Sequence, residues 1–212
     1  NKLFRFIAHI TNTKKIIADI GEFNICANEE QSEKIRLWFK KILKIIGVKT
    51  TIKGKIKSGN YLIISNHSSW LDIIILGSTF KTTFLSKIEV SRWPVIGKIT
   101  TAVDMLFINR GAKDAALLAV NGISKFILNN RNVTIFPEGT SSGGKDLLKF
   151  KPRLFASCID TNSPIQCVII RYPYKEKNIH PSVPFVRGDS LFLNILKVLF
   201  QDNITAEITI SD

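Results

Sequence analysis

Short apolar runs that alternate with segments of helical periodicity constrain the fold of this chain more than any other feature. The runs are rich in Ile, Val and Phe, as in strands that are buried on both faces. Strands are predicted at 48–53, 61–65, 82–85, 105–108, 133–136 and 165–170, and helices at 70–78, 95–103, 112–128 and 151–160. This alternation predicts one α/β domain over 48–212, with a largely parallel central sheet flanked by helices.

The segment 1–47 before this domain contains a basic amphipathic helix. One face of the predicted helix 32–46 carries Ile35, Trp38, Phe39, Ile42, Leu43 and Ile46, which follow helical spacing. Nine Lys or Arg residues and no Asp or Glu lie between Lys34 and Leu71. The pattern has two interpretations. The helix packs on the domain with its lysines in solvent, or it lies apolar side down in a membrane interface with its lysines on anionic lipid. Both interpretations hold if one edge of the helix packs on the domain.

The composition favours a membrane surface as a partner. The chain combines a net charge of +13 with 45% hydrophobic residues, which fits a greasy, anionic surface better than nucleic acid, so no nucleic acid is expected. No apolar run reaches the length of about 18 residues that a spanning helix needs. The expected location is the cytoplasmic face of the cell membrane, either peripheral or anchored by residues missing before Asn1.

The cysteines and the absence of ligand patterns predict no metal and no disulfide framework. Cys26, Cys158 and Cys167 are scattered and form no C-x-x-C pair, so a reduced compartment is expected.

His67 and Asp72 form the first candidate for chemistry, directly after the predicted strand 61–65. Five residues along a helix turn by about 140°, which would point the two side chains apart. His67 is therefore expected in the loop or cap and Asp72 in the first helical turn beneath it. An aspartate can hold one imidazole nitrogen while the other takes a proton, as in a general base. The alternative is a helix N-cap histidine followed by an aspartate favoured by the helix dipole.

Two further blocks follow predicted strands: Phe107-Ile108-Asn109-Arg110 and the segment 136–142, Phe-Pro-Glu-Gly-Thr-Ser-Ser. The carboxyl ends of parallel strands lie at one edge of a sheet, so His67, Arg110 and Glu138 are expected to converge there. The arginine fork suits a phosphate, and a glycine lets backbone N–H groups approach an anion.

In order and spacing these blocks resemble the glycerolipid acyltransferase family, which has an H-x4-D block, an F-I-x-R block, an F-P-E-G block and a proline-containing apolar strand, here 163–170. The resemblance runs from about Val48 to the C-terminus. It implies transfer of a fatty acyl group from acyl carrier protein or coenzyme A to a lysolipid hydroxyl, without a cofactor. The first expected acceptor is 1-acyl-glycerol-3-phosphate, which would give phosphatidic acid. The stretches 150–155 and 187–189 also look like the branch that acylates lyso-ornithine lipids.

The resemblance also implies roles for individual residues. His67 would be the general base and Asp72 its orienting partner. The alternatives are that Glu138 is one half of a structural ion pair with Arg110 and that Lys87 is a solvated lysine. Lys149 and Lys151 are weaker candidates for phosphate contact. The residues expected to bind the acceptor are Arg110, Glu138, Gly139, Thr140, Ser141 and Lys87.

Two other motifs overlap the third block. Gly139-Thr-Ser-Ser-Gly143 satisfies the G-x-S-x-G of a hydrolase nucleophile elbow, and 139–145 matches a P-loop except that Asp146 replaces the Ser or Thr that binds magnesium. Neither explains the His67–Asp72 pair. A third alternative from another class is a non-catalytic basic protein bound to membranes or nucleic acid.

Overall fold

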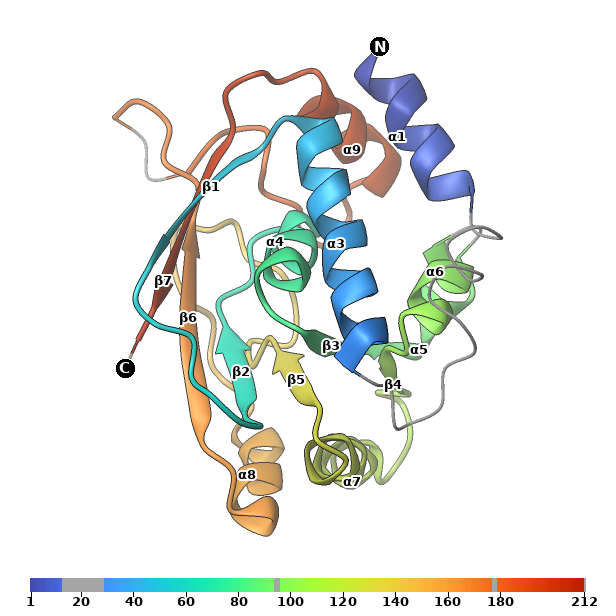
Figure 1. Ribbon diagram of the computed structural model, residues 1–212, viewed down its shortest axis with the longest axis vertical. Helices are drawn as coiled ribbons and strands as arrows, with labels where there is room; N and C mark the ends of the chain where they lie inside the picture. The colour runs from blue at the N-terminus through green and yellow to red at the C-terminus, as the bar shows by residue number, and fades with distance from the viewer. Residues whose placement is uncertain (13–28, 94–95, 177–178, 212) are drawn as a thin grey trace.

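A computed structural model describes residues 1–12, 29–93, 96–176 and 179–211 of the chain (Figure 1). Within these residues one sheet has the strand order β1-β7-β6-β2-β5-β3-β4. All neighbouring strands pair in parallel except β6 and β7, so β1 and β7 run opposite to the other five. The strands are β1 (Lys49–Lys53), β2 (Leu62–Ser65), β3 (Thr82–Lys87), β4 (Leu106–Ile108), β5 (Asn132–Ile135), β6 (Ile165–Arg171) and β7 (Thr205–Ile210).

The predicted α/β domain with a largely parallel sheet is confirmed, and β1 to β6 lie where strands were predicted. Sequence reasoning missed β7. Its side chains alternate, with Ala206, Ile208 and Ile210 buried and the residues between them more exposed. Such a two-residue period marks a strand with one face toward solvent, and it is a weaker sequence signal than a continuous apolar run.

Helices cover both faces of the sheet (Figure 1). Adjacent residues of β2 point to opposite faces, so Ile63 joins the larger core with α3 and α4, and Leu62 joins a smaller core with α7. The helical elements are α1 (Lys2–Thr11), α3 (Glu29–Ile46), α4 (Leu71–Thr79), α5 (Ile88–Ser91), α6 (Ile96–Ala102), α7 (Ala115–Leu128), the 3₁₀ helix η1 (Pro152–Phe155), α8 (Ala156–Thr161) and α9 (Leu191–Leu199).

The apolar face of α3 packs on the domain core. Phe39 is 2% exposed and lies so close to α4 that a Cβ on Gly77 would come within 2.4 Å of its ring. Ile35, Ile42 and Ile46 are buried in the same cluster. The expectation that this face lies apolar side down in a membrane is therefore wrong, because the protein itself occupies the face. The helix is a core element with exposed lysines, which was the other interpretation of the pattern.

The remaining expectations about the chain ends and cysteines are only partly covered. Among the described helices, none combines the length and the apolar character needed to cross a bilayer. Cys158 is buried and Cys167 is exposed, and both are free thiols. Cys26 and the predicted start of a helix at Val95 lie outside the described residues.

Candidate active site

Five neighbouring parallel strands bring candidate residues to one edge of the sheet. His67 follows β2, Lys87 ends β3, Arg110 follows β4 and Glu138 follows β5, all at the carboxyl ends of the strands. Tyr172 directly follows β6 at the same edge. The expected convergence of His67, Arg110 and Glu138 at one edge of the sheet is confirmed, because the carboxyl ends of neighbouring parallel strands lie at the same edge.

The His67–Asp72 pair forms a hydrogen-bonded unit between the end of β2 and the start of α4. His67 Nδ1 lies 2.9 Å from Oδ2 of Asp72, and the same oxygen accepts the backbone N–H groups of Ser68 at 2.7 Å and Ser69 at 2.9 Å. His67 lies in the loop and Asp72 in the first turn of α4, as predicted. The N-cap residue of α4 is Trp70, so the N-cap histidine interpretation is wrong.

This arrangement selects a tautomer of the imidazole. Oδ2 of the buried Asp72 accepts two backbone N–H groups and also faces Nδ1 of His67, so Nδ1 is the ring nitrogen that donates to it. Nε2 then keeps its lone pair, and no described residue hydrogen-bonds to it. The ring also stacks on Phe136, with centroids 3.9 Å apart and planes 17° apart. The basic nitrogen of His67 is thus fixed in direction and available to a substrate.

Glu138 joins two loops. Its Oε1 accepts the backbone N–H of His67 at 2.7 Å and its Oε2 accepts that of Leu148 at 2.9 Å. The side chain is 4% exposed. The expected alternative of an ion pair with Arg110 is wrong, because Arg110 donates to the carbonyl of Gly139 and forms no ion pair with Glu138. The acceptor-binding role implied by the resemblance stays a prediction. The contacts present make Glu138 a structural link, or brace, between the backbone at His67 and the backbone at Leu148.

Gly139 and Arg110 meet through the glycine carbonyl. Arg110 Nη1 donates to the oxygen of Gly139, whose φ of +74° is a conformation that favours glycine. The sequence suggested that the N–H of Gly139 would be free to bind an anion. It is not free, because it donates to the carbonyl oxygen of Phe136 at 2.9 Å. In the described structure the next two N–H groups, of Thr140 and Ser141, have no protein acceptor. These two amides, rather than that of Gly139, are the backbone donors available to a ligand.

Positive side chains from four segments surround this turn. The pKa of Lys87 lies below its usual value, first because of burial and then because of the positive charges of Arg110, Arg187 and Lys151, against which Glu89 acts. A Cβ on Gly139 would lie 2.9 Å from Nζ of Lys151. We call Lys87, Arg110, Lys151 and Arg187 the cation cluster. All four side chains are exposed, and the repulsion between them is relieved when an anion binds.

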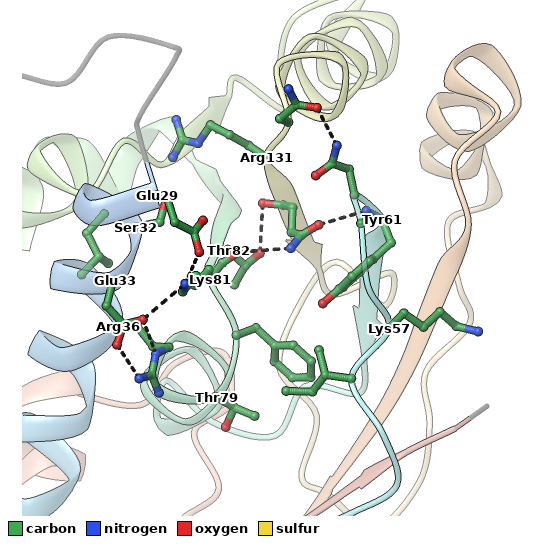
Figure 2. Close-up of a pocket in the computed structure, with 17 residues that line it drawn as sticks. Glu29, Ser32, Glu33, Arg36, Lys57, Tyr61, Thr79, Lys81, Thr82 and Arg131 are labelled. Carbon is green, nitrogen blue, oxygen red and sulfur yellow. Dashed lines mark hydrogen bonds and ion pairs between the residues drawn. The ribbon is translucent and has the colours of Figure 1, made fainter.

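A cavity lies away from this edge. Its volume is about 610 Å³. Its lining includes Glu33, Arg36, Tyr61 and Lys81 (Figure 2). Tyr61, Lys81 and Thr82 precede or begin strands, so the cavity is at the amino edge of the sheet, opposite His67. Four of its charged groups pair with one another: Arg36 binds Glu33, and Lys81 binds Glu29. It contains none of the residues predicted for chemistry.

Two residues that contact the His67–Asp72 segment, Tyr172 and Asn194, were not predicted from the sequence. Tyr172 donates its hydroxyl hydrogen to Oδ1 of Asp72. Trp70 Nε1 donates to Asn194 Oδ1 at 2.8 Å, which ties α9 to the loop that carries His67. Tyr172 stands at the end of a predicted strand and could have been considered on that ground. Nothing near Asn194 in the sequence indicated this contact, since α9 itself had not been predicted.

The two overlapping motifs lack the structure that they require. Residues 139–151 are all described, and none of them is helical before η1 begins at Pro152. A nucleophile elbow and a P-loop both lead directly into a helix. The hydrolase and nucleotide-binding interpretations are therefore wrong.

Comparison with known proteins agrees with the order of the blocks. A family model described as "Acyltransferase" matches residues 47–171, which include the His67–Asp72 pair, Arg110 and Glu138. The chain belongs to the acyltransferase family. The crystal structure of the 1-acyl-sn-glycerophosphate (LPA) acyltransferase PlsC from Thermotoga maritima has the same fold, with a TM-score of 0.66 and 17% identity over 99% of this chain and 82% of that one.

Two curated relatives are named for different lysolipid acceptors. A lyso-ornithine lipid O-acyltransferase from Pseudomonas aeruginosa is 32% identical over 164 residues, which are 77% of this chain and 63% of that protein. A 1-acyl-sn-glycerol-3-phosphate acyltransferase from Neisseria gonorrhoeae is 35% identical over 111 residues, which are 52% of this chain and 44% of that protein. The chain thus spans about half to two thirds of the lengths of these relatives.

Proposed function

We propose that this protein transfers a fatty acyl group from a thioester of acyl carrier protein or coenzyme A to the free hydroxyl of a lysolipid. The observation that carries the proposal is the free Nε2 of His67, fixed by Asp72 and Phe136 at the sheet edge that also holds the cation cluster. A base beside an anion site suits an acceptor that has a hydroxyl close to an anionic head group.

The reaction follows from these groups. Nε2 of His67 takes the proton from the acceptor hydroxyl while its oxygen attacks the thioester carbonyl. The tetrahedral intermediate collapses, the carbon–sulfur bond breaks, and the imidazolium returns its proton to the departing thiolate. The new ester and a free thiol are the products. The unbonded N–H groups of Thr140 and Ser141 are our candidates for stabilising negative charge that develops in the transition state.

For the acceptor we propose 1-acyl-glycerol-3-phosphate, which would give phosphatidic acid. The cation cluster supports a phosphate dianion, because Lys87, Arg110, Lys151 and Arg187 bring positive charges together with one nearby carboxylate, Glu89. Charge-assisted contacts from an arginine fork suit phosphate oxygens.

A lyso-ornithine lipid is the second candidate acceptor. The observation that favours it is the similarity to the Pseudomonas protein, which extends over a longer part of the chain than the similarity to the Neisseria protein. An ornithine head group carries an amine, and Glu89 is the carboxylate that acts on Lys87 within the cation cluster.

We also propose that the protein works at the cytoplasmic face of the cell membrane, on anionic lipid, and has no nucleic-acid partner. Support comes from α1 and α9, which lie side by side (Figure 1) and expose large apolar side chains. Phe4 and Ile7 of α1 are exposed, as are Phe192 and Leu193 of α9. We call these four residues the apolar patch. Exposed aromatic and aliphatic side chains on a protein of net charge +13 suit an anionic bilayer interface.

The test is a panel of lysolipid acceptors incubated with acyl-CoA and acyl carrier protein thioesters. Thiol release that requires both 1-acyl-glycerol-3-phosphate and His67 supports the proposal. Thiol release with lyso-ornithine lipid but not with 1-acyl-glycerol-3-phosphate would identify the second candidate as the acceptor. No lysolipid-dependent thiol release with any pair would refute the acyltransferase proposal and favour the non-catalytic alternative.

A further inference from the structure

Tyr172 places a buried hydroxyl on the far side of the carboxylate that holds His67. The residue follows β6, is 1% exposed and donates to Oδ1 of Asp72. Its own carbonyl accepts the backbone N–H of His180 at 2.7 Å, which fixes the start of the loop after β6. The phenol therefore approaches Asp72 from a strand end and not from a free loop.

The hydrogen bonds of Asp72 are divided unequally between its two oxygens. Oδ2 accepts from Nδ1 of His67 and from the backbone N–H groups of Ser68 and Ser69. Among the described residues, Oδ1 accepts from Tyr172 alone. Rotation of the carboxylate about its bond to Cβ moves both oxygens, so the donor on Oδ1 adds to the hold that the N–H groups of Ser68 and Ser69 have on its plane. Tyr172 thus contributes to the position of the oxygen that faces Nδ1 of His67.

We propose that Tyr172 is a positioning residue for the general base: through Asp72 it fixes the orientation of the His67 ring and limits the negative charge that Asp72 presents to it. The inference rests on the proposed function, in which His67 takes the acceptor's proton. Burial and the neighbouring carboxylate of Asp72 hold the pKa of Tyr172 well above its usual value. The phenol therefore remains protonated and acts as a donor throughout the working pH range.

The proposal predicts effects of two opposite signs on the pH dependence. Replacing Tyr172 by phenylalanine removes a donor from Asp72, which leaves more negative charge opposite the imidazolium. The acid limb of the kcat profile should then move to higher pH. Placing 3-fluorotyrosine at position 172 makes a stronger donor of nearly the same shape, and should move the acid limb to lower pH. A hydroxyl that served only to fill the core would produce neither shift.

Tyr61 provides the matched control. It is also a buried tyrosine, 3% exposed, but it lies at the amino edge of the sheet and lines the cavity in Figure 2. Tyr172→Phe should lower kcat about tenfold, the worth of one hydrogen bond to a charged group, with the KM of both substrates within a factor of about two. Tyr61→Phe should leave kcat and its pH profile unchanged. Equal effects in the two variants would overturn the proposal.

A double-mutant cycle tests whether Tyr172 acts through Asp72. In an Asp72→Asn background the phenol has no carboxylate to orient, so Tyr172→Phe should cause little further loss of kcat. If Tyr172→Phe lowered kcat by the same factor in both backgrounds, the proposal would be overturned, and the role of Tyr172 would be structural only.

A readout without turnover separates this inference from the proposed function. The ¹⁵N signals of the His67 ring, identified by their absence in His67→Ala, report its titration directly. The midpoint should rise in Tyr172→Phe, fall with 3-fluorotyrosine and stay unchanged in Tyr61→Phe. If the wild type transfers no acyl group but these shifts occur, the proposed reaction fails and the positioning of His67 by Tyr172 stands. If turnover is present and the midpoints do not move, the positioning role is refuted. The fluorotyrosine protein keeps the phenol, so the test survives if Tyr172→Phe does not fold.

Discussion

The imidazole of His67 lies flat against the ring of Phe136, with centroids 3.9 Å apart and planes 17° apart. Phe136 begins the Phe-Pro-Glu-Gly block, so the stack joins the segment that carries the base to the segment that carries Gly139. Together with the bond from Nδ1 to Asp72, it restricts rotation of the ring about both of its side-chain torsions. The segment of His67 and the turn at Gly139, which we call the acceptor turn after its proposed role, are therefore held together by direct contact between two motifs far apart in sequence.

The base gives the first prediction. His67→Ala should lower kcat by roughly 10² to 10⁴-fold, the usual worth of a general base, with the fold unchanged by circular dichroism. Asp72→Asn should also be slow, because an amide cannot hold the Nδ1–H tautomer in place. Single-turnover assays on acyl-CoA measure both variants. Near-wild-type turnover in His67→Ala would refute the mechanism.

The second prediction concerns the acceptor anion. Arg110→Ala should raise the acceptor KM by up to about 10²-fold, the loss of one charge-assisted contact worth roughly 1.5–3 kcal/mol. The KM of the acyl donor should stay within a factor of about two. Lys53→Ala, in the outermost strand β1, removes a positive charge far from the site and serves as the control. A change confined to the donor KM would mean that Arg110 binds the other substrate.

Glu138 gives the third prediction, which concerns stability. Glu138→Gln keeps one acceptor oxygen, so one of the two N–H groups, of His67 or Leu148, loses its partner. The free energy of unfolding should fall by about 1–3 kcal/mol, measured by urea denaturation. The exposed Glu176→Gln, which should change stability little, is the control. An unchanged unfolding midpoint with a raised acceptor KM would show that Glu138 binds substrate instead of bracing the loops.

The fourth prediction distinguishes a core helix from a membrane helix. Phe39 lies against α4 inside the larger core, so Phe39→Ala should destabilise the protein by roughly 3–5 kcal/mol through the cavity it leaves. Thermal unfolding in detergent-free buffer measures the loss. A variant of normal stability that no longer bound vesicles would restore the membrane-facing interpretation of α3.

The fifth prediction tests the apolar patch. Replacing Phe192 and Leu193 by serine should reduce binding to anionic vesicles, and binding should weaken with salt, since charge is screened over about 8 Å at physiological ionic strength. Leu117 and Leu118 on α7 are similarly exposed and provide the control pair. Sedimentation with vesicles of phosphatidylglycerol and phosphatidylcholine measures both. Equal loss from the two pairs, or none from either, would place the membrane contact elsewhere.

The sequence predicted six of the seven strands because most of them contain apolar runs separated by helical patterns, and it missed β7, whose apolar residues alternate with polar ones. The position of Asp72 below His67 followed from the geometry of a helical turn. The face of α3 could not be assigned in the same way. A helix buried in a core and a helix buried in lipid have the same apolar stripe, and only the position of α4 decides between them.

The contacts within the site were less accessible to sequence reasoning. A glutamate next to a glycine turn suits an anion site, a brace or an ion pair, and the sequence does not say which N–H groups it meets. Tyr172 reaches Asp72 because β6 lies beside β2, a pairing that is a property of strand order. Such partners become visible only once the long-range topology is known.

The brace formed by Glu138 has a consequence for how proteins of this architecture diversify. Glu138 holds the N–H of His67, and the carbonyl of His67 accepts the N–H of Ser142 at 2.8 Å. Substitutions that move the acceptor turn therefore also move the backbone of the base, and selection acts on both at once. Lys151 belongs to the same tied unit, because its backbone N–H donates to the carbonyl of Pro137 at 2.9 Å, whereas Arg187 reaches the site from another segment. Under the proposed function, a change of head-group preference can therefore arise at Arg187 while the backbone of His67 stays in place.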